Sequence, residues 1–410
     1  MNKKAFPGFA LLCCLVYFCG YFNRLDYAAA LTAIIQDTGI TRSAASVAVT
    51  GIFITYGAGQ LLSGLLGDRF SPRFIITAGL IGTAACNVAM TLPVGVAVMT
   101  AVWCVNGVFQ AMLWPPMVRA MAERFSPDEY RRACAWVSAA ASVATVLIYL
   151  LVPACLALGS WRWAFVFSAV FAVAVAAVWA TQYAKFSVRS PAPEEEAAAA
   201  PEPASDGAHP SLLRLLLASG LPLALSAIAL QGILRDGVLT WVPEYVKSEF
   251  HLDAGASILS TVILPLFSIF SVFAATALLR AVRSETLAGG LCFGVGAAAA
   301  TVLALCRPGS IAVTLVLMAL IVGAMHGVNM ILTCHMPAHF AAVGAVSGIS
   351  GLVNMFTYLG SAVSAYGIAA CSERFGWGFT LTAWMVVAWA GTAACLFVTP
   401  QWHRFCRKHA

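Results

Sequence analysis

The stretch Gly64-Leu-Leu-Gly67-Asp68-Arg69-Phe-Ser-Pro-Arg73 places three charged side chains in one short segment between two long apolar runs. The flanking runs, 44–66 and 74–92, contain no Asp, Glu, Lys or Arg and are long enough to cross a bilayer. Glycines let neighbouring helices approach closely, and a carboxylate at a helix end can pair with a basic residue across an interface. We therefore expect a tight polar turn between two spanning helices.

The composition extends this interpretation to the whole chain. Of 410 residues, 61% are hydrophobic and 10% are charged, whereas soluble domains carry about a quarter charged residues. This excludes a soluble enzyme, a DNA-binding domain and a disordered protein. The net charge of +6 is typical of the basic cytoplasmic loops of membrane proteins, so we expect no nucleic-acid partner. The thirteen cysteines include no C-x-x-C and are expected to be small buried hydrophobes.

Apolar runs separated by short polar turns predict twelve spanning helices and an all-α membrane protein. The runs lie near 8–34, 44–66, 74–92, 94–121, 133–157, 161–182, 214–243, 256–279, 286–306, 310–336, 344–371 and 378–399. With the N-terminus inside, the inner segments hold sixteen Lys and Arg residues and the outer loops hold five. This bias predicts an integral protein of the plasma (inner) membrane with both termini in the cytoplasm.

One long polar segment divides the spans into two sets of six. It is rich in Pro, Ala and Glu, a composition that cannot bury a core, so we expect a flexible linker. The predicted units are 1–182, the linker 183–213, 214–399 and a basic cytoplasmic tail, 400–410. Shifting the first half by 211 residues places Arg24 on Arg235. Two parallel six-helix repeats are typical of a transporter that rocks its halves around a central site.

The turn quoted first resembles the signature loop of the major facilitator superfamily, which supports this fold and gives Gly64, Asp68, Arg69 and Arg73 the role of a gate motif. The usual glycine of that signature is Ser71 here. At the equivalent place in the second half the motif has decayed, because Leu279 stands where an acidic residue would map. The bland alternative is that the charged residues are ordinary solvated loop positions.

Four charges lie deep in the predicted spans: Arg24, Asp26, Arg235 and Asp236. A central Arg costs about 2.5–3.5 kcal/mol on insertion scales, so such a residue is expected to face a wet, functional cavity. Two guanidinium groups facing each other across the halves would bind a phosphate or carboxylate. In the alternative, each Arg is neutralised by its nearby Asp. We favour the anion site, because residues one or two apart on a helix point about 100° or 200° apart.

Further stretches resemble the organophosphate:phosphate antiporters, a family within the superfamily that includes exchangers of glycerol 3-phosphate and hexose phosphate and some sensors. These stretches include Tyr21-Phe-Asn-Arg24, Phe109-Gln-Ala-Met-Leu-Trp114-Pro-Pro and Tyr358-Leu-Gly-Ser. The resemblance implies that Arg24 and Arg235 clamp the substrate's phosphate. It also implies that the cavity is lined by Tyr21, Tyr56, Trp114 and Tyr358. From helical spacing alone, Gln60 and Asn354 share faces with Tyr56 and Tyr358 and join the candidate substrate-binding set.

The departures from this family leave the substrate open. Gln60 stands where the glycerol-phosphate exchanger has a lysine, and the run Ser138–Ser142 has no counterpart of its span-five histidine. A singly charged carboxylate therefore competes with a sugar phosphate as substrate. Asp26 and Asp236 become candidates for proton coupling, since a desolvated carboxyl can exchange a proton during the cycle.

We therefore expect a secondary transporter that moves a small organic anion by alternating access, coupled to inorganic phosphate or to protons. The alternatives are a non-transporting sugar-phosphate sensor on the same fold and a proton-coupled drug exporter. We expect a monomer in the lipid bilayer that is not an enzyme and has no cofactor or metal, because no catalytic set or metal motif is visible. His335 and His339 are expected to be solvated loop histidines, and Trp114-Pro-Pro a kink.

Overall fold

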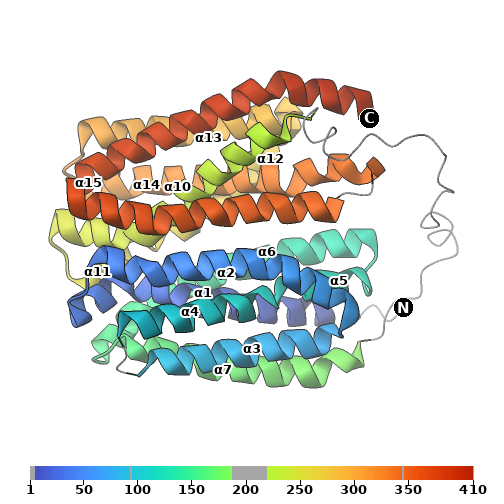
Figure 1. Ribbon diagram of the computed structural model, residues 1–410, viewed down its shortest axis with the longest axis horizontal. Helices are drawn as coiled ribbons and strands as arrows, with labels where there is room; N and C mark the ends of the chain where they lie inside the picture. Colours follow the sequence, from blue (N-terminus) through green and yellow to red (C-terminus); the bar gives the residue numbers. More distant parts are fainter. Residues whose placement is uncertain (1–4, 93–94, 187–218, 344–345, 410) are drawn as a thin grey trace, which may run out of the picture.

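The computed structural model describes residues 5–92, 95–186, 219–343 and 346–409 (Figure 1). Within these residues every regular element is a helix. The first part holds α1 (Ala5–Thr38), α2 (Arg42–Arg69), α3 (Pro72–Met90), α4 (Val96–Ala111), α5 (Trp114–Ala122), α6 (Pro127–Ala157), α7 (Arg162–Gln182) and η1 (Tyr183–Lys185). The second part holds α10 (Leu221–Phe250), α11 (Ala254–Ser260), α12 (Ile263–Val282), α13 (Glu285–Cys306), α14 (Ile311–Asn329), η2 (Met330–His335), η3 (Met336–Val343) and α15 (Val346–His409).

The predicted all-α membrane architecture is confirmed. Ten helical stretches of the described residues are long and apolar enough to cross a bilayer. One of them, Gly351–Arg407, covers the last two predicted spans, and Gly376 leaves the helical conformation between them with φ 79° and ψ 173°. The predicted span 44–66 is not among the ten but lies within α2. Most of the predicted linker, from residue 187 on, lies outside the described residues. The predicted tail, 400–410, continues α15 as helix as far as His409.

Two helix breaks fall within predicted spans. α4 ends at Ala111 and α5 begins at Trp114, where Pro115 and Pro116 lack the N–H groups that a continuous helix would need. The kink expected there is present. A second break, between α11 and α12 at Thr261–Val262, interrupts the predicted span 256–279 and was not expected. The result is that two spans consist of a short and a long helix.

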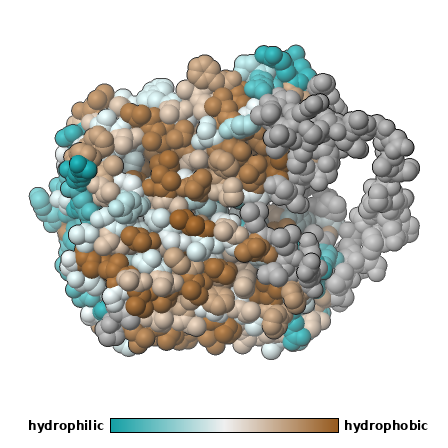
Figure 2. Space-filling model, viewed as in Figure 1, coloured by the Kyte–Doolittle hydropathy of each residue, from teal (hydrophilic) through white to brown (hydrophobic). Residues whose placement is uncertain are grey.

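The first half (α1–α7) and the second half (α10–α15) form two groups of roughly parallel helices. The first half is drawn in the lower part of Figure 1 and the second half in the upper part. They meet mainly where α2 packs on α15 and where α6 packs on α11 and α12. Both described chain ends lie at one end of the bundle, which we call the terminal end; the opposite end, where α1 passes into α2, is the distal end. Apolar side chains cover much of the side seen in Figure 2, and hydrophilic ones gather towards its edges.

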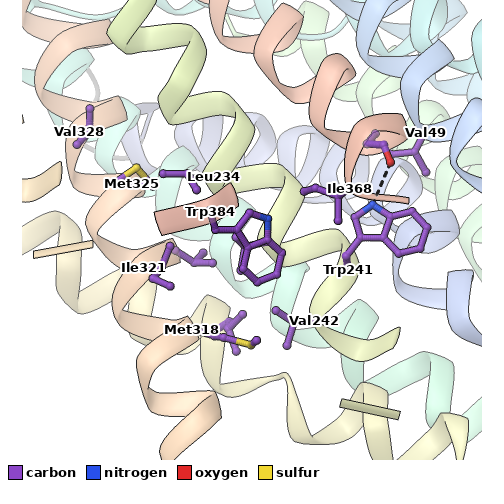
Figure 3. Packing of buried hydrophobic residues seen from close by; sticks show 14 of the residues in the cluster. Val49, Leu234, Trp241, Val242, Met318, Ile321, Met325, Val328, Ile368 and Trp384 are labelled. Atoms are coloured by element: carbon purple, nitrogen blue, oxygen red, sulfur yellow. Dashed lines mark hydrogen bonds between the residues drawn. The ribbon is translucent and has the colours of Figure 1, made fainter. Parts of the chain in front are cut away.

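Two apolar clusters form the core. The larger joins both halves, and its first-half members all come from the distal end: 27–34, 45–52, 90–103 and 148–165. Part of it is drawn in Figure 3, where Trp241 of α10 donates its Nε1–H to the carbonyl oxygen of Ala365 at 3.0 Å. The smaller cluster holds only first-half residues of the terminal end, between Phe9 and Tyr183. Among described residues, apolar packing therefore links the halves at the distal end.

Two glycines let α10 and α15 approach closely. A Cβ atom at Gly360 would collide with the backbone carbonyl of Ala229, and one at Gly232 would collide with the carbonyl oxygen of Thr357. Lipid tails are as apolar as helix surfaces, so helices in a bilayer associate largely through van der Waals contacts. Small residues allow the close approach that these contacts need. This close approach fixes the part of α10 that carries Arg235.

Gly360→Ala should lower the unfolding free energy by about 1–3 kcal/mol, because the new methyl group must push two backbones apart. Gly367→Ala is the matched control on the same helix, since nothing lies within 4 Å of its Cβ position; it should be neutral or stabilising by up to about 1 kcal/mol. Thermal melting of both purified variants in detergent checks this. Equal melting temperatures would contradict the close-packing account.

Candidate substrate site

An aromatic stripe on α1 forms one wall of the site. Tyr17 and Tyr21 lie one helical turn apart with ring centroids 5.0 Å apart, as their i, i+4 spacing predicts. Trp114, the first residue of α5, packs on Tyr17 at 4.8 Å. The proline break before α5 therefore positions an indole ring against α1.

Arg24 continues this stripe by one turn and is held by aromatic rings. Its Cζ atom lies 4.2 Å from the ring centroid of Tyr21 and 4.7 Å from that of Tyr56. Such cation–π contacts contribute about 0.5–2 kcal/mol each, more where water is excluded. Among the residues that the structure describes, Arg24 forms no ion pair with an acidic side chain. The two rings therefore stabilise the positive charge of Arg24 without neutralising it.

Arg235 is held differently, by its neighbour in sequence. Its Nε donates to Oδ1 of Asp236 and its NH2 group to Oδ2, both at 2.7 Å. Ser361 of α15 donates to the same Oδ2 at 2.6 Å. The expectation that adjacent helix positions would keep this Arg and Asp apart is wrong, because the long Arg side chain folds back across the intervening angle. The pair is 11% and 15% exposed, respectively, so it is shielded from water.

Both arginines interact with the same two tyrosines, one from each half. The phenol of Tyr21 interacts electrostatically with both guanidinium groups, and so does that of Tyr358 on α15. The ring of Tyr358 packs edge-on against that of Tyr56, with centroids 4.9 Å apart, which joins the halves directly beside Arg24. The structure therefore brings together six of the predicted substrate residues: Tyr21, Arg24, Tyr56, Trp114, Arg235 and Tyr358.

The remaining predicted positions are placed as follows. Gln60 lies one turn beyond Tyr56, Asn354 lies one turn before Tyr358, and both are partly buried. Asp26 is fully buried; its Oδ1 accepts from the backbone N–H of Tyr27 at 2.8 Å and the carboxyl interacts with Ser168 of α7. Asp26 therefore faces α7 in the first half rather than the arginines.

The structure describes little of the predicted gate motif. The side chains of Asp68 and Arg69 and the surroundings of Gly64 lie outside the described residues. Arg73 is exposed, and its Nε donates to the carbonyl oxygen of Ala180 at 2.7 Å. This contact ties the start of α3 to the end of α7 within the first half.

Comparison with known proteins identifies this architecture. Residues 13–365 match the Major Facilitator Superfamily. The chain belongs to this superfamily. A bacterial homologue of the human lysosomal transporter Spinster, solved in an inward-facing and occupied conformation, has the same fold with a TM-score of 0.71 and 13% identity. That match covers 100% of this chain and 97% of the homologue.

Curated relatives place the chain near the organophosphate:phosphate antiporters, as the sequence motifs indicated. A probable hexose phosphate transport protein of Chlamydia muridarum is 31% identical over 109 residues, 27% of this chain and 24% of the relative. The membrane sensor protein UhpC of Salmonella typhimurium is 28% identical over 158 residues, 38% of this chain and 36% of the relative. The aligned stretches thus span about a quarter to a third of the length of these relatives.

Superfamily members alternate between states open on opposite sides, and here polar contacts close the distal end. Arg42 at the start of α2 forms an ion pair with Glu244 of α10 at 3.2 Å, and its Cζ lies 5.2 Å from the ring centroid of Trp377. Ser43 donates its backbone N–H and its hydroxyl to the Glu373 carboxylate at 2.9 and 2.5 Å. These bonds cross the halves, as the apolar cluster beneath them does.

Ser361 and His326 are site residues that the sequence reasoning did not assign. Ser361 lies three residues after Tyr358, on the same face of α15, so helical spacing could have revealed it. His326 of α14 interacts electrostatically with both Arg235 and Asp236. Gln231, one turn before Arg235 on α10, donates to the carbonyl oxygen of Met325 at 3.2 Å, a helix–helix contact.

The distal closure can be tested with paired cysteines. Ser43→Cys with Glu373→Cys should react with a short thiol cross-linker several-fold faster than Ser43→Cys with Arg374→Cys, because Arg374 projects from a different face of the same helix. Peptide mapping by mass spectrometry distinguishes the new cross-link from reactions of the native thiols. Equal rates for the two pairs would argue against this contact between the halves.

Proposed function

We propose that the protein is a secondary transporter of a small organic anion, a carboxylate or a sugar phosphate, that binds between Arg24 and Arg235. The supporting observation is the state of Arg24. A guanidinium group inside a membrane protein costs free energy unless a counter-charge or water compensates it. Arg24 lies against the rings of Tyr21 and Tyr56 and has no acidic partner within the described residues, so in this proposal an anion supplies the missing charge.

The Asp236 carboxylate competes with an anionic substrate for Arg235. An anion that engages the Nε and NH2 donors of Arg235 must displace the Asp236 carboxylate, which already uses both of these groups, whereas the remaining N–H groups of the guanidinium require no displacement. Protonation of Asp236 removes the competing charge and frees the fork. Proton uptake and anion binding then favour each other, which is the thermodynamic requirement for symport. We therefore favour proton coupling, with Asp236 rather than Asp26 as the coupling group, because Asp26 faces α7.

The charge inventory favours a singly charged substrate while Asp236 is ionised and a doubly charged substrate once Asp236 is protonated. With Asp236 ionised, the described site holds two cations and one anion, a net of one positive charge. Gln60 adds hydrogen-bonding capacity without charge. Phosphate esters carry up to two negative charges near neutral pH, so they need Asp236 protonated or displaced, whereas a carboxylate balances the site directly. The likeness to the sensor protein UhpC supports one alternative, a receptor that binds the anion without moving it.

Transport into proteoliposomes tests the coupling. We expect uptake of a carboxylate from a panel of carboxylated and phosphorylated sugars to rise with an inward proton gradient and to fall when an ionophore collapses it. Exchange that depends on phosphate inside the vesicles, without an effect of pH, would replace symport by the antiport of the relatives' family. Saturable binding with no flux in either experiment would indicate a sensor.

Lysine replacement tests the two arginines. Arg24→Lys and Arg235→Lys keep the charge but lose the planar fork, and each should lower uptake about 10- to 100-fold, equivalent to about 1.5–3 kcal/mol for charged hydrogen bonds. Arg374→Lys is the control, because Arg374 is exposed. Normal uptake by both cavity variants would sink the clamp.

Asp236→Asn separates binding from coupling. The neutral amide cannot compete as an anion, so the variant should bind substrate at least as tightly as the parent protein while its uptake loses dependence on the proton gradient. Asp26→Asn is the comparison, and it should retain gradient dependence. Gradient dependence that survives in Asp236→Asn but not in Asp26→Asn would move the coupling role to α1.

A further inference from the structure

A second cluster of chemically reactive side chains lies at the terminal end, on the second half alone. Glu285, His339 and Cys406 come from α13, η3 and the end of α15, three segments far apart in sequence. One ligand atom from each lies within 4.8 Å of the others. The arginine site uses none of these residues, and His339, expected to be a solvated loop histidine, is instead bonded within this cluster.

Glu285 and His339 are oriented by their surroundings. Glu285 is the first residue of α13, after the N-cap Ser284. Its Oε2 accepts from the indole N–H of buried Trp402 at 2.9 Å. Its Oε1 lies 2.8 Å from Nε2 of His339. The His339 ring packs edge-on against Trp402, with centroids 5.2 Å apart, so one tryptophan positions both groups.

Cys406 completes the group from the same helix as Trp402. It lies four residues later, so both side chains share one face of α15. Its Sγ lies 3.7 Å from Nδ1 of His339 and forms no disulfide. A carboxylate, an imidazole and a thiol thus converge from three segments, while His339 remains 36% exposed and gives the cluster access to solvent.

We propose that Glu285, His339 and Cys406 bind one zinc-like divalent metal ion. Carboxylate oxygen, imidazole nitrogen and thiolate sulfur are the three ligand types of protein zinc sites, at about 2.0–2.3 Å from the metal. Ligand atoms around a tetrahedral ion lie about 3.2–3.8 Å apart by these lengths. Glu285 contacts Nε2 of His339 and Cys406 contacts Nδ1, so the His339 ring and the other two side chains must rotate to bring one of these nitrogens and the other two ligand atoms around one ion. The proton of the Cys406 thiol and any proton on the coordinating nitrogen leave as the ion binds.

The surrounding residues match what such a site needs. Trp402 keeps its hydrogen bond to Oε2 of Glu285 while Oε1 coordinates, which is the outer-shell support that orients metal ligands. The three protein ligands leave a fourth position for water on the exposed side. A bound ion would tie η3, which lies in the connection between α14 and α15, to the start of α13 and the end of α15.

Cobalt binding to the full-length protein in detergent, after removal of metals with a chelator, tests the site. Co²⁺ should produce a thiolate-to-cobalt charge-transfer band that saturates at one ion per chain, and Zn²⁺ should abolish the band by displacement. Cys406→Ser should lose the band. Cys334→Ser is the matched control, because Cys334 is an exposed thiol at the same end of the molecule, and it should keep the band.

His339→Gln and Glu285→Gln should weaken Zn²⁺ affinity at least 10-fold, and Zn²⁺ should raise the melting temperature of the parent protein but not of Cys406→Ser. Circular dichroism of each variant without metal verifies the fold. No charge-transfer band in the parent protein, or a band lost in Cys334→Ser and kept in Cys406→Ser, would overturn the proposal. Arg24→Lys should bind cobalt normally, so the outcome is independent of the transport proposal.

Discussion

The arrangement around the site depends on one constraint, which is that a guanidinium group cannot lie inside a bilayer protein without compensation. The two halves meet it in different ways. Arg24 lies against the faces of Tyr21 and Tyr56, whereas Arg235 is paired with Asp236. Tyr21 and Tyr56 stabilise the cation of Arg24 through their ring faces and their hydroxyl groups without neutralising its charge. An ionised Asp236 neutralises Arg235 and occupies two of its donor groups.

Helix α15 contacts the surroundings of both arginines. Gly232 and Gly360 bring α10 against α15, so Ser361 reaches the Asp236 carboxylate. The ring of Tyr358, on the same helix, packs against Tyr56 of α2. α15 therefore contacts the counter-ion of one arginine and the aromatic support of the other. Any rocking of the halves must change the surroundings of Arg24 and leave the Arg235 pair, which lies within one half, intact.

The membrane fold was predictable from the sequence, and so was the proximity of several candidate site residues, because both follow from strong local signals. Long apolar runs admit few alternatives in a bilayer, and the repeat offset that aligned Arg24 with Arg235 pointed to the site. The pairing of Arg235 with Asp236 was not predictable, since Cβ directions along a helix say little about where a long side chain ends. The cluster around His339 was missed because its members are far apart in sequence and follow no motif spacing.

In the transport cycle that we propose, the asymmetry between the arginines would also order the events of binding. An anion entering the site would meet Arg24, which has no acidic partner among the described residues, and Arg235, which is paired with Asp236, so we expect the Arg24 side to engage first. Its charge then opposes the nearby Asp236 carboxylate, and either proton uptake or displacement relieves that repulsion and releases the Arg235 fork. Only then does the anion bridge the two halves. In this proposal a ligand without negative charge cannot start the sequence, so the pairing of Arg235 with Asp236 would select for anions.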